Sequence, residues 1–268
     1  MAVDKTKALE AMKTNLLKNK DAVVIVGNDL VRDAHLFHAT ENNQKTYSRK
    51  QMIKDPENFW KFYLTNIAEN ERNKTGNENQ QALIDLLNTG IVKTVIDMNY
   101  DGYIKDHITS DVQYIQLKGD RRELFCTKCG EIVPYNKEIS GKKVLTHNDC
   151  NENCQCEGRL QPTVPFYGSK ISKQLWNQIV ESIFDTTNPE NPQPRTHALI
   201  LIGIDLTEDI LSELVESYQA ARGKKNLEHL LIAITYHSPQ TLQLLNVEFG
   251  TSDEIDKSLI RLKEFLKE

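Results

Sequence analysis

Short, uninterrupted apolar runs are the feature that most constrains the fold of this chain. Residues 22–26 read AVVIV, five apolar residues in a row that end at Gly27. A run of this length suits a strand buried on both faces, as in a parallel sheet covered by helices. We predict further strands from the segments "IVKTVIDMN", "VQYIQL", "HALILIGID" and "LEHLLIAIT".

Segments with helical periodicity separate these strands. A helix is predicted for residues 5–19, and another for "DPENFWKFY", with Asp55 as its N-cap and Pro56 at its first position. Residues 32–50 are polar and irregular. More helices are expected at about 79–89 and in "SKQLWNQIVESIF", "TEDILSELVESYQAARG" and "SDEIDKSLIRLKEFLKE". The alternation predicts an α/β fold, a Rossmann-like parallel sheet with helices on both faces.

The cysteines predict a metal site. All five lie in the segment from Cys126 to Cys156, and Cys126-x2-Cys129 is followed, after twenty intervening residues, by Cys150. Clusters with this spacing are typical of a structural zinc ribbon with four thiolate ligands. We assign Cys126, Cys129 and Cys156 as ligands. We prefer Cys150 to Cys154 as the fourth, because Cys154 leaves only one residue before Cys156; the choice between them stays open.

Composition excludes some functions and partners. A formal net charge of −5 argues against a nucleic-acid partner, because such proteins are usually basic. The longest apolar run, "HALILIGIDL", is too short for a bilayer span, and the first residues show no secretion signal. We therefore expect a cytoplasmic protein without a membrane partner, where clustered cysteines indicate metal binding more than disulfides.

The order of the segments predicts two domains. A chain of 268 residues can form one large domain with an inserted module. We assign residues 1–31, 79–119 and 166–268 to a Rossmann-like large domain. The small domain would combine a helical insertion, residues 32–78, with a zinc-binding module, residues 120–165.

Several motifs follow one another along the chain: the buried strand ending in glycine, "KDPENFWKFY", "IDMNYDG", the cysteine module, "CEGRLQPTVPFYG" and "LILIGIDL". Taken in order, they resemble the motifs of the sirtuins, the NAD-dependent protein deacylases and ADP-ribosyltransferases. The resemblance covers nearly the whole chain. It implies NAD as cofactor, a structural zinc, and an acyl-lysine protein substrate or another protein partner.

The resemblance also implies cofactor-binding positions. The family's glycine-rich phosphate loop falls on residues 27–31, where Gly27 is retained and Asn28 and Asp29 follow. Such a loop needs glycines so that backbone N–H groups can approach a pyrophosphate, and Asp29 adds a negative charge there. The family's adenosine-side segment resembles residues 203–206, with Gly203 retained and Asp205 in place of a hydroxyl residue.

The family's nicotinamide-side motif resembles residues 97–102. Asn99 and Asp101 are retained, and the resemblance implies that they contact the nicotinamide end of the cofactor and serve catalysis. Asn, Asp and Gly are also the commonest residues of a turn after a strand, so a purely structural role stays open. Met98 stands where the family has a polar residue.

The family's catalytic histidine falls on Lys118, in "QLKG". That histidine is a general base, a task for a group that titrates near neutral pH. An unperturbed lysine, with a pKa of about 10.4, is protonated there and accepts no proton. Three aspartates of the expected pocket, at positions 29, 97 and 205, would further favour its charged form. His107 is nearby, but its spacing does not place it on the catalytic face.

Two functions follow as hypotheses. The first is a sirtuin-like zinc protein with a degenerate NAD site, a pseudoenzyme or much-weakened enzyme that acts through protein or ligand binding. The alternative is an active NAD-dependent deacylase, ADP-ribosyltransferase or NAD hydrolase that uses Asn99 and Asp101. Because the acidic residues oppose a pyrophosphate, we expect NAD binding to be weak or absent.

Overall fold

The computed structural model describes most of the chain. The described residues are 5–31, 45–65, 76–135, 156, 158–166, 169–188, 191–204, 209–222, 228–235, 247, 249–251 and 254–267. Within these ranges, no helix combines the length and the apolar character that a bilayer crossing requires.

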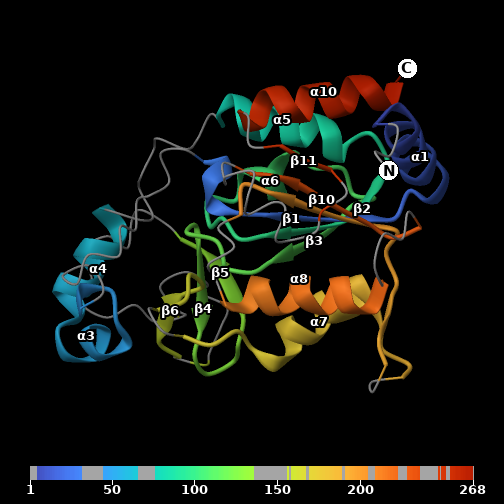
Figure 1. The fold of residues 1–268 in the computed structure, drawn as a ribbon. Coiled ribbons are helices and arrows are strands. Elements are labelled where there is room, and N and C mark those ends of the chain that lie inside the picture. The colour runs from blue at the N-terminus through green and yellow to red at the C-terminus, as the bar shows by residue number, and fades with distance from the viewer. Residues whose placement is uncertain are drawn as a thin grey trace.

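A six-stranded parallel sheet forms the centre of the molecule (Figure 1). Its strand order is β11-β10-β9-β1-β2-β3. The strands are β1 (Ala22–Val26), β2 (Val92–Asp97), β3 (Gln113–Gln116), β9 (Ala198–Ile202), β10 (Leu230–Ile234) and β11 (Phe249–Thr251). The predicted Rossmann-like fold class is confirmed, and β11 is a strand that the apolar pattern did not reveal.

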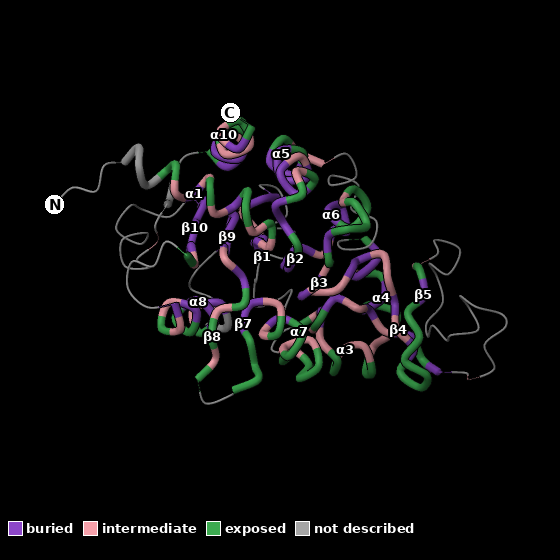
Figure 2. The backbone as a smooth tube through the Cα atoms, turned by 90° about the vertical axis from the view of Figure 1, so that its right-hand side faces the viewer, coloured by how far each residue is buried: buried purple, intermediate pink, exposed green. Residues whose placement is uncertain are grey.

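Helices cover both faces of the sheet (Figures 1 and 2). One face carries α1 (Lys5–Asn19), α5 (Glu78–Leu87), α6 (Tyr103–His107) and α10 (Ile255–Lys267), and the other carries α7 (Lys173–Ile183) and α8 (Asp209–Arg222). Alternate residues of β1 enter opposite apolar clusters: Val24 packs with the first group of helices, and Val23 and Ile25 pack with the second. Burial on both faces explains why these strands lack polar alternation.

A smaller unit lies beside the large sheet (Figure 1). It contains α3 (Arg49–Lys54), α4 (Pro56–Tyr63) and the antiparallel sheet β5-β4-β6, formed by β4 (Glu123–Cys126), β5 (Ile132–Pro134) and β6 (Leu160–Pro162). A third apolar cluster joins α4 to this sheet through Phe59, Tyr63 and Leu124. The exact boundaries of the two predicted domains stay a prediction.

The start of α4 follows the predicted capping signal. The Asp55 side chain accepts a hydrogen bond from the backbone N–H of Asn58 at 3.3 Å, and Pro56 occupies the first turn. Residues 32–50 were predicted to be irregular, but Arg49 and Lys50 belong to α3. Ser48 caps this helix by accepting from the N–H of Gln51. Two short strands, β7 (Phe184–Asp185) and β8 (Gln193–Pro194), were also not predicted.

Two glycines allow the carboxyl ends of β1 and β9 to approach closely. A Cβ on Gly27 would lie 2.2 Å from the carbonyl oxygen of Gly203, and a Cβ on Gly203 would lie 2.7 Å from the backbone nitrogen of Leu30. Gly203 also has a φ of 59°, in the left-handed region that favours glycine. The backbone contact between these strands therefore tolerates no side chain.

We predict that Gly203→Ala destabilises the fold more than Gly90→Ala. Both glycines have positive φ, but a Cβ on Gly90 would meet no atom within 4 Å. The difference in the free energy of unfolding should be about 1–3 kcal/mol, since only Gly203 adds steric crowding to the backbone strain. Urea unfolding of both variants measures it, and equal losses of stability would contradict the contact.

Candidate functional site

The carboxyl ends of four strands bring the predicted cofactor residues to one edge of the sheet. Val26 pairs with Asp97 of β2 and with Ile202 of β9, and Asp97 pairs with Gln116 of β3. The segments that follow these strands, which include Gly27, Asn99, Lys118 and Gly203, therefore emerge side by side. In open α/β sheets ligands bind at this edge. Asp205 lies outside the described residues.

The segment after β1 turns at once into the short 3-10 helix η1 (Asn28–Leu30). Four of the five backbone N–H groups of residues 27–31 donate within the fold. Gly27 donates to the carbonyl of Ile202 at 2.8 Å and Asp29 to that of Gly203 at 3.0 Å. The side chains of Asn28 and Asp29 are half-buried. The turn thus uses its own donors to hold β1 against β9.

Asn99 is fixed from two sides. Its side-chain Nδ2 donates to Oδ1 of Asp97 at 3.0 Å and to the carbonyl of Gly27 at 3.3 Å, so both amide hydrogens have an acceptor. Asn99 is 3% exposed. A ligand at this position can therefore meet only the acceptor oxygen of its amide.

Asp97 is a fully buried carboxylic acid beneath Asn99. It accepts from the backbone N–H of Asn99 at 2.9 Å and from the hydroxyl of Tyr114 at 2.9 Å. Burial, with a contribution from the charge of Asp101, raises the pKa of Asp97 to about 7. At neutral pH the Asp97 carboxyl is therefore close to half-protonated, whereas an ordinary aspartate carries a full negative charge.

Asp101 is held by the turn that begins α6. Its Oδ2 accepts from Nε2 of Gln80 at 2.9 Å, and its Oδ1 accepts from the backbone N–H of Tyr103 at 2.8 Å. Burial raises the pKa of this carboxyl, although these hydrogen bonds and the nearby Arg121 act in the opposite direction. These contacts fix the orientation of the Asp101 side chain within the turn.

Three further residues that the sequence analysis considered, Lys118, Met98 and His107, lie in different environments. Lys118 is half-buried directly after β3, and Gly119 follows it with a φ of 69° against the backbone of Thr163. Met98 is buried in the apolar cluster on the α7 side of the sheet. His107 stacks on Tyr103 with ring centroids 4.1 Å apart, and its Nδ1 bonds to the carbonyl of Tyr103. These contacts tie His107 to its own helix.

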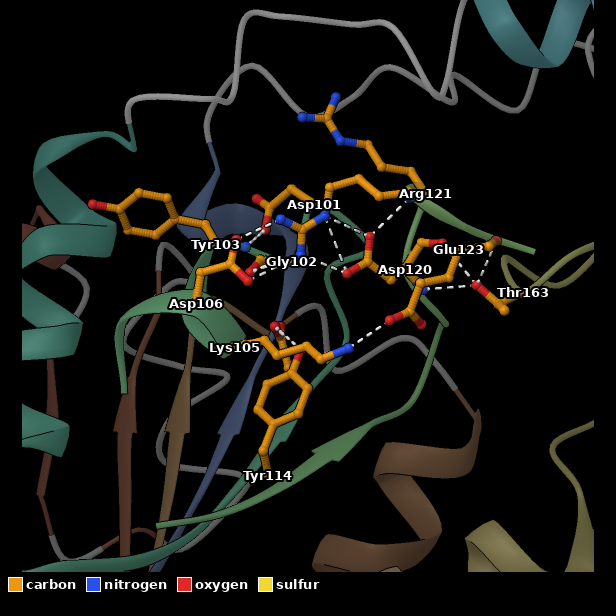
Figure 3. A network of polar contacts seen from close by, with 12 residues as sticks. Asp101, Gly102, Tyr103, Lys105, Asp106, Tyr114, Asp120, Arg121, Glu123 and Thr163 are labelled. Atoms are coloured by element: carbon orange, nitrogen blue, oxygen red, sulfur yellow. Dashed lines mark hydrogen bonds and ion pairs between the residues drawn. The ribbon is translucent and has the colours of Figure 1, made fainter. Parts of the chain in front are cut away.

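An ion-pair network connects this edge to the smaller unit (Figure 3). Arg122, just before β4, pairs with Asp120 at 2.7 Å and with Asp106 of α6. Lys105 of α6 pairs with Glu123 at 2.6 Å. A Cβ on Gly102 would lie 1.9 Å from Nη2 of Arg122, so the guanidinium lies where a side chain would otherwise be.

Three residues of the site were missed in the sequence. Gln80 lies within α5 as part of its capping box, Tyr114 lies in β3, and Arg121 lies in the link to β4. All three surround the acids Asp97, at the end of β2, and Asp101, which follows it: Tyr114 bonds to Asp97, Gln80 bonds to Asp101, and Arg121 lies near Asp101. Each comes from a different part of the chain, and the pairing of β3 with β2 and the packing of α5 and the link to β4 bring them together.

Three cysteines gather as the spacing predicted. The Sγ atom of Cys156 lies 3.4 Å from that of Cys126 and 3.7 Å from that of Cys129. Four sulfurs around a tetrahedral zinc, with Zn–S bonds of about 2.3 Å, would be separated by about 3.8 Å. A Cβ on Gly158 would lie 2.2 Å from Sγ of Cys126, so a glycine is required beside the cluster. Cys150 and Cys154 lie outside the described residues.

The chemistry of Cys126 also fits a metal ligand. Burial raises the pKa of its thiol, but hydrogen bonds from the backbone N–H groups of Cys129 and Lys128 lower it to about 6. A thiolate is the form that binds zinc. Cys126, Cys129 and Cys156 would thus hold a zinc ion with one further ligand, and the ion would tie β4 to the segment before β6.

Comparison with known proteins identifies the family. The Sir2 family sequence model matches residues 18–188. The NAD-dependent protein deacetylase of Sulfolobus acidocaldarius is 30% identical over 121 residues, which cover 44% of this chain and 44% of that protein. The NAD-dependent protein deacylase of Pyrococcus abyssi is 27% identical over 59% of this chain and 65% of its own length. The alignment with the Sulfolobus acidocaldarius protein thus spans less than half of that protein's length.

Solved structures agree on the fold. A Sir2 homologue in complex with NAD superposes with a TM-score of 0.70 at 17% identity, over 96% of this chain and 93% of the other. A Sir2 protein bound to a propionylated peptide gives a TM-score of 0.68 at 15% identity, over 98% of both chains. The fold is thus that of a Rossmann-like α/β protein with a cysteine-bearing module. The chain belongs to the Sir2 family.

We predict that Asp97 makes the protein less stable as pH rises. Its pKa of about 7 in the folded state exceeds the unfolded value of about 3.9, so the unfolded chain binds fewer protons between these values and stability falls from about pH 4 to pH 7. Between about pH 5 and pH 8 the contribution of Asp97 should lower the free energy of unfolding by a few kcal/mol. Asp97→Asn should remove this loss, which urea unfolding at the two pH values measures. The exposed Asp111→Asn serves as control. If the two variants show the same pH dependence, the interpretation of Asp97 is wrong.

We predict about one zinc per purified chain, bound by Cys126, Cys129 and Cys156 with one further cysteine. Cys126→Ser should lose most of the metal and lower the unfolding temperature, as should a chelator. Metal analysis of Cys150→Ser and Cys154→Ser identifies the fourth ligand, since only one of them should lose zinc. A metal-free protein of unchanged stability would exclude a structural zinc.

Proposed function

We propose that this Sir2-family protein is a pseudoenzyme, or a much-weakened enzyme, that binds NAD poorly and acts by binding a protein or another ligand. The observation that carries the proposal is Lys118, which follows β3 at the position where the family motif has its histidine base. A general base typically contributes a factor of about 10²–10⁴ to the rate. Its loss alone would leave little of the family reaction.

The hydrogen bonds of the turn after β1 support the proposal that NAD binds only weakly. A pyrophosphate is held by backbone N–H groups that are free to donate, but residues 27–31 donate four of theirs within the fold. Asp29 adds a carboxylate at the place where the second loop glycine would allow close approach. On these observations the turn does not fit a dinucleotide phosphate.

The contacts of the segment after β6 support the proposal that this protein does not hold a peptide by strand addition. Edge-strand addition of a substrate peptide needs free backbone donors and acceptors. Here the carbonyl of Val164 accepts from the hydroxyl of Tyr47 at 2.7 Å, and Pro165 has no N–H to offer. An acyl-lysine protein is still a candidate partner, but a protein that docks without strand addition suits this segment better.

The alternative function is an active NAD-dependent deacylase, ADP-ribosyltransferase or NAD hydrolase. The rigid placement of Asn99 and Asp101 at the carboxyl end of β2 favours it, because both side chains are already oriented by the fold. In this case Asn99 and Asp101 would orient the nicotinamide end of the cofactor.

Release of nicotinamide from NAD, measured with and without an acetyl-lysine peptide, separates the two functions. We expect release at least about 100-fold slower than by the Sulfolobus acidocaldarius relative under the same conditions. Lys118→His should increase release, more so when it is combined with Asp29→Gly. Lys118→Met, which also lacks the base, should not.

The active-enzyme alternative makes the opposite prediction. Robust release by the natural chain, abolished in Asn99→Ala but retained in the exposed control Asn188→Ala, would overturn the pseudoenzyme proposal. Folding of each variant is checked by thermal unfolding before its activity is compared.

A further inference from the structure

A polar cavity of about 280 Å³ lies at the opposite end of the sheet from the candidate site. The amino ends of β1, β2 and β3 and the carboxyl-terminal half of α7 form its walls. Its lining includes four charged residues, which are Asp21, Lys93, Glu181 and Arg195, and several neutral polar ones, among them Thr94 and Thr196. Neither the family motifs nor the proposed function uses this end of the molecule.

An irregularity in β2 directs a charged side chain into the cavity. Ala22 pairs with Val92 and Val23 with Thr94, so Lys93 is an extra residue between two successive pairs. Lys93 is the one exposed residue of β2, a strand with neighbours on both sides. Bulges of this kind re-aim side chains and recur near binding sites. Here the bulge brings Lys93 and Thr94 to the same cavity.

The charged side chains of the cavity do not pair with one another. Oδ2 of Asp21 is hydrogen-bonded to Nδ1 of His197 at 2.6 Å, a contact that is an ion pair only when the imidazole is protonated. Among the residues that the structure describes, no ion pair involves Lys93, Arg195 or Glu181. The guanidinium of Arg195 donates to the backbone carbonyl of Glu181 at 3.2 Å, and its charge helps to lower the pKa of Asp185. Two cations and two carboxylates thus border the same space, and the described residues show no ion pair among the four.

We propose that this cavity binds a small zwitterion with the chemistry of a free amino acid. The ligand carboxylate would pair with Lys93 and Arg195, and its ammonium group with Glu181. Thr94, whose hydroxyl donates to Gln113 at 3.3 Å, keeps an acceptor for a further N–H of the ligand. The volume corresponds to roughly nine water molecules, which matches a molecule with about ten non-hydrogen atoms.

Calorimetric titration with L-glutamine tests the proposal, because this probe has a suitable size and an amide for the polar wall. N-acetyl-L-glutamine lacks the ammonium charge, and L-glutaminamide lacks the carboxylate. We expect L-glutamine to bind and each analogue to bind at least about tenfold more weakly. Lys93→Met and Arg195→Gln should each weaken L-glutamine binding to a similar degree, and Lys93→Arg should largely keep it.

Lys61→Met, which removes an exposed lysine of α4, is the matched control and should leave binding unchanged. The proposal is overturned if L-glutamine gives no saturable heat, if either analogue binds as well as L-glutamine, or if Lys93→Met and Arg195→Gln leave the affinity unchanged. Since the candidate NAD site lies at the other end of the strands, these results do not depend on whether NAD binds.

Discussion

The parallel pairing of β1 with both β2 and β9 is the constraint on which the rest of the structure depends. It places Val26 between Asp97 and Ile202, so the segments that follow all emerge at one edge. Gly27 and Gly203 allow these segments to touch through their backbones. Apolar burial on both faces of β1 supplies the driving force, and the glycines permit the contact at its end.

The same contact underlies the proposal that this edge binds NAD poorly. Backbone donors that hold β1 against β9 are no longer available to an anion, and Asp29 adds a carboxylate beside them. A like-charge contact of about 1 kcal/mol between this carboxylate and a pyrophosphate would lower the affinity about fivefold. Asn99 and Asp101, by contrast, are held in place by the fold itself. We therefore propose that the site keeps the orientation of Asn99 and Asp101 but binds the phosphates of NAD poorly.

Much of the fold could be predicted because its signals are local. The run at residues 22–26 and the Asp55-Pro56 helix start each depend on neighbouring residues, and both predictions were correct. The spacing of Cys126, Cys129 and Cys156 likewise predicted their convergence. The strand β11 escaped prediction, because its three residues form no apolar run. The assignment of catalytic and cofactor roles to single residues stays a prediction.

The buried acid network could not be predicted from the sequence. Asp97 alone looks like an ordinary aspartate after a strand, and its altered pKa results from burial and from the neighbouring Asp101. Tyr114 and Gln80 reach these acids from elements separated in the chain, so their roles appear only when β3 and α5 are packed against β2. Long-range polar contacts of this kind leave no periodic signal in a sequence.

A calorimetric titration of the zinc-loaded protein with NAD tests the central claim most directly. The altered turn after β1 predicts no saturable binding, or a Kd weaker than about 1 mM. A Kd in the low-micromolar range would contradict the account and would favour an active Sir2 enzyme.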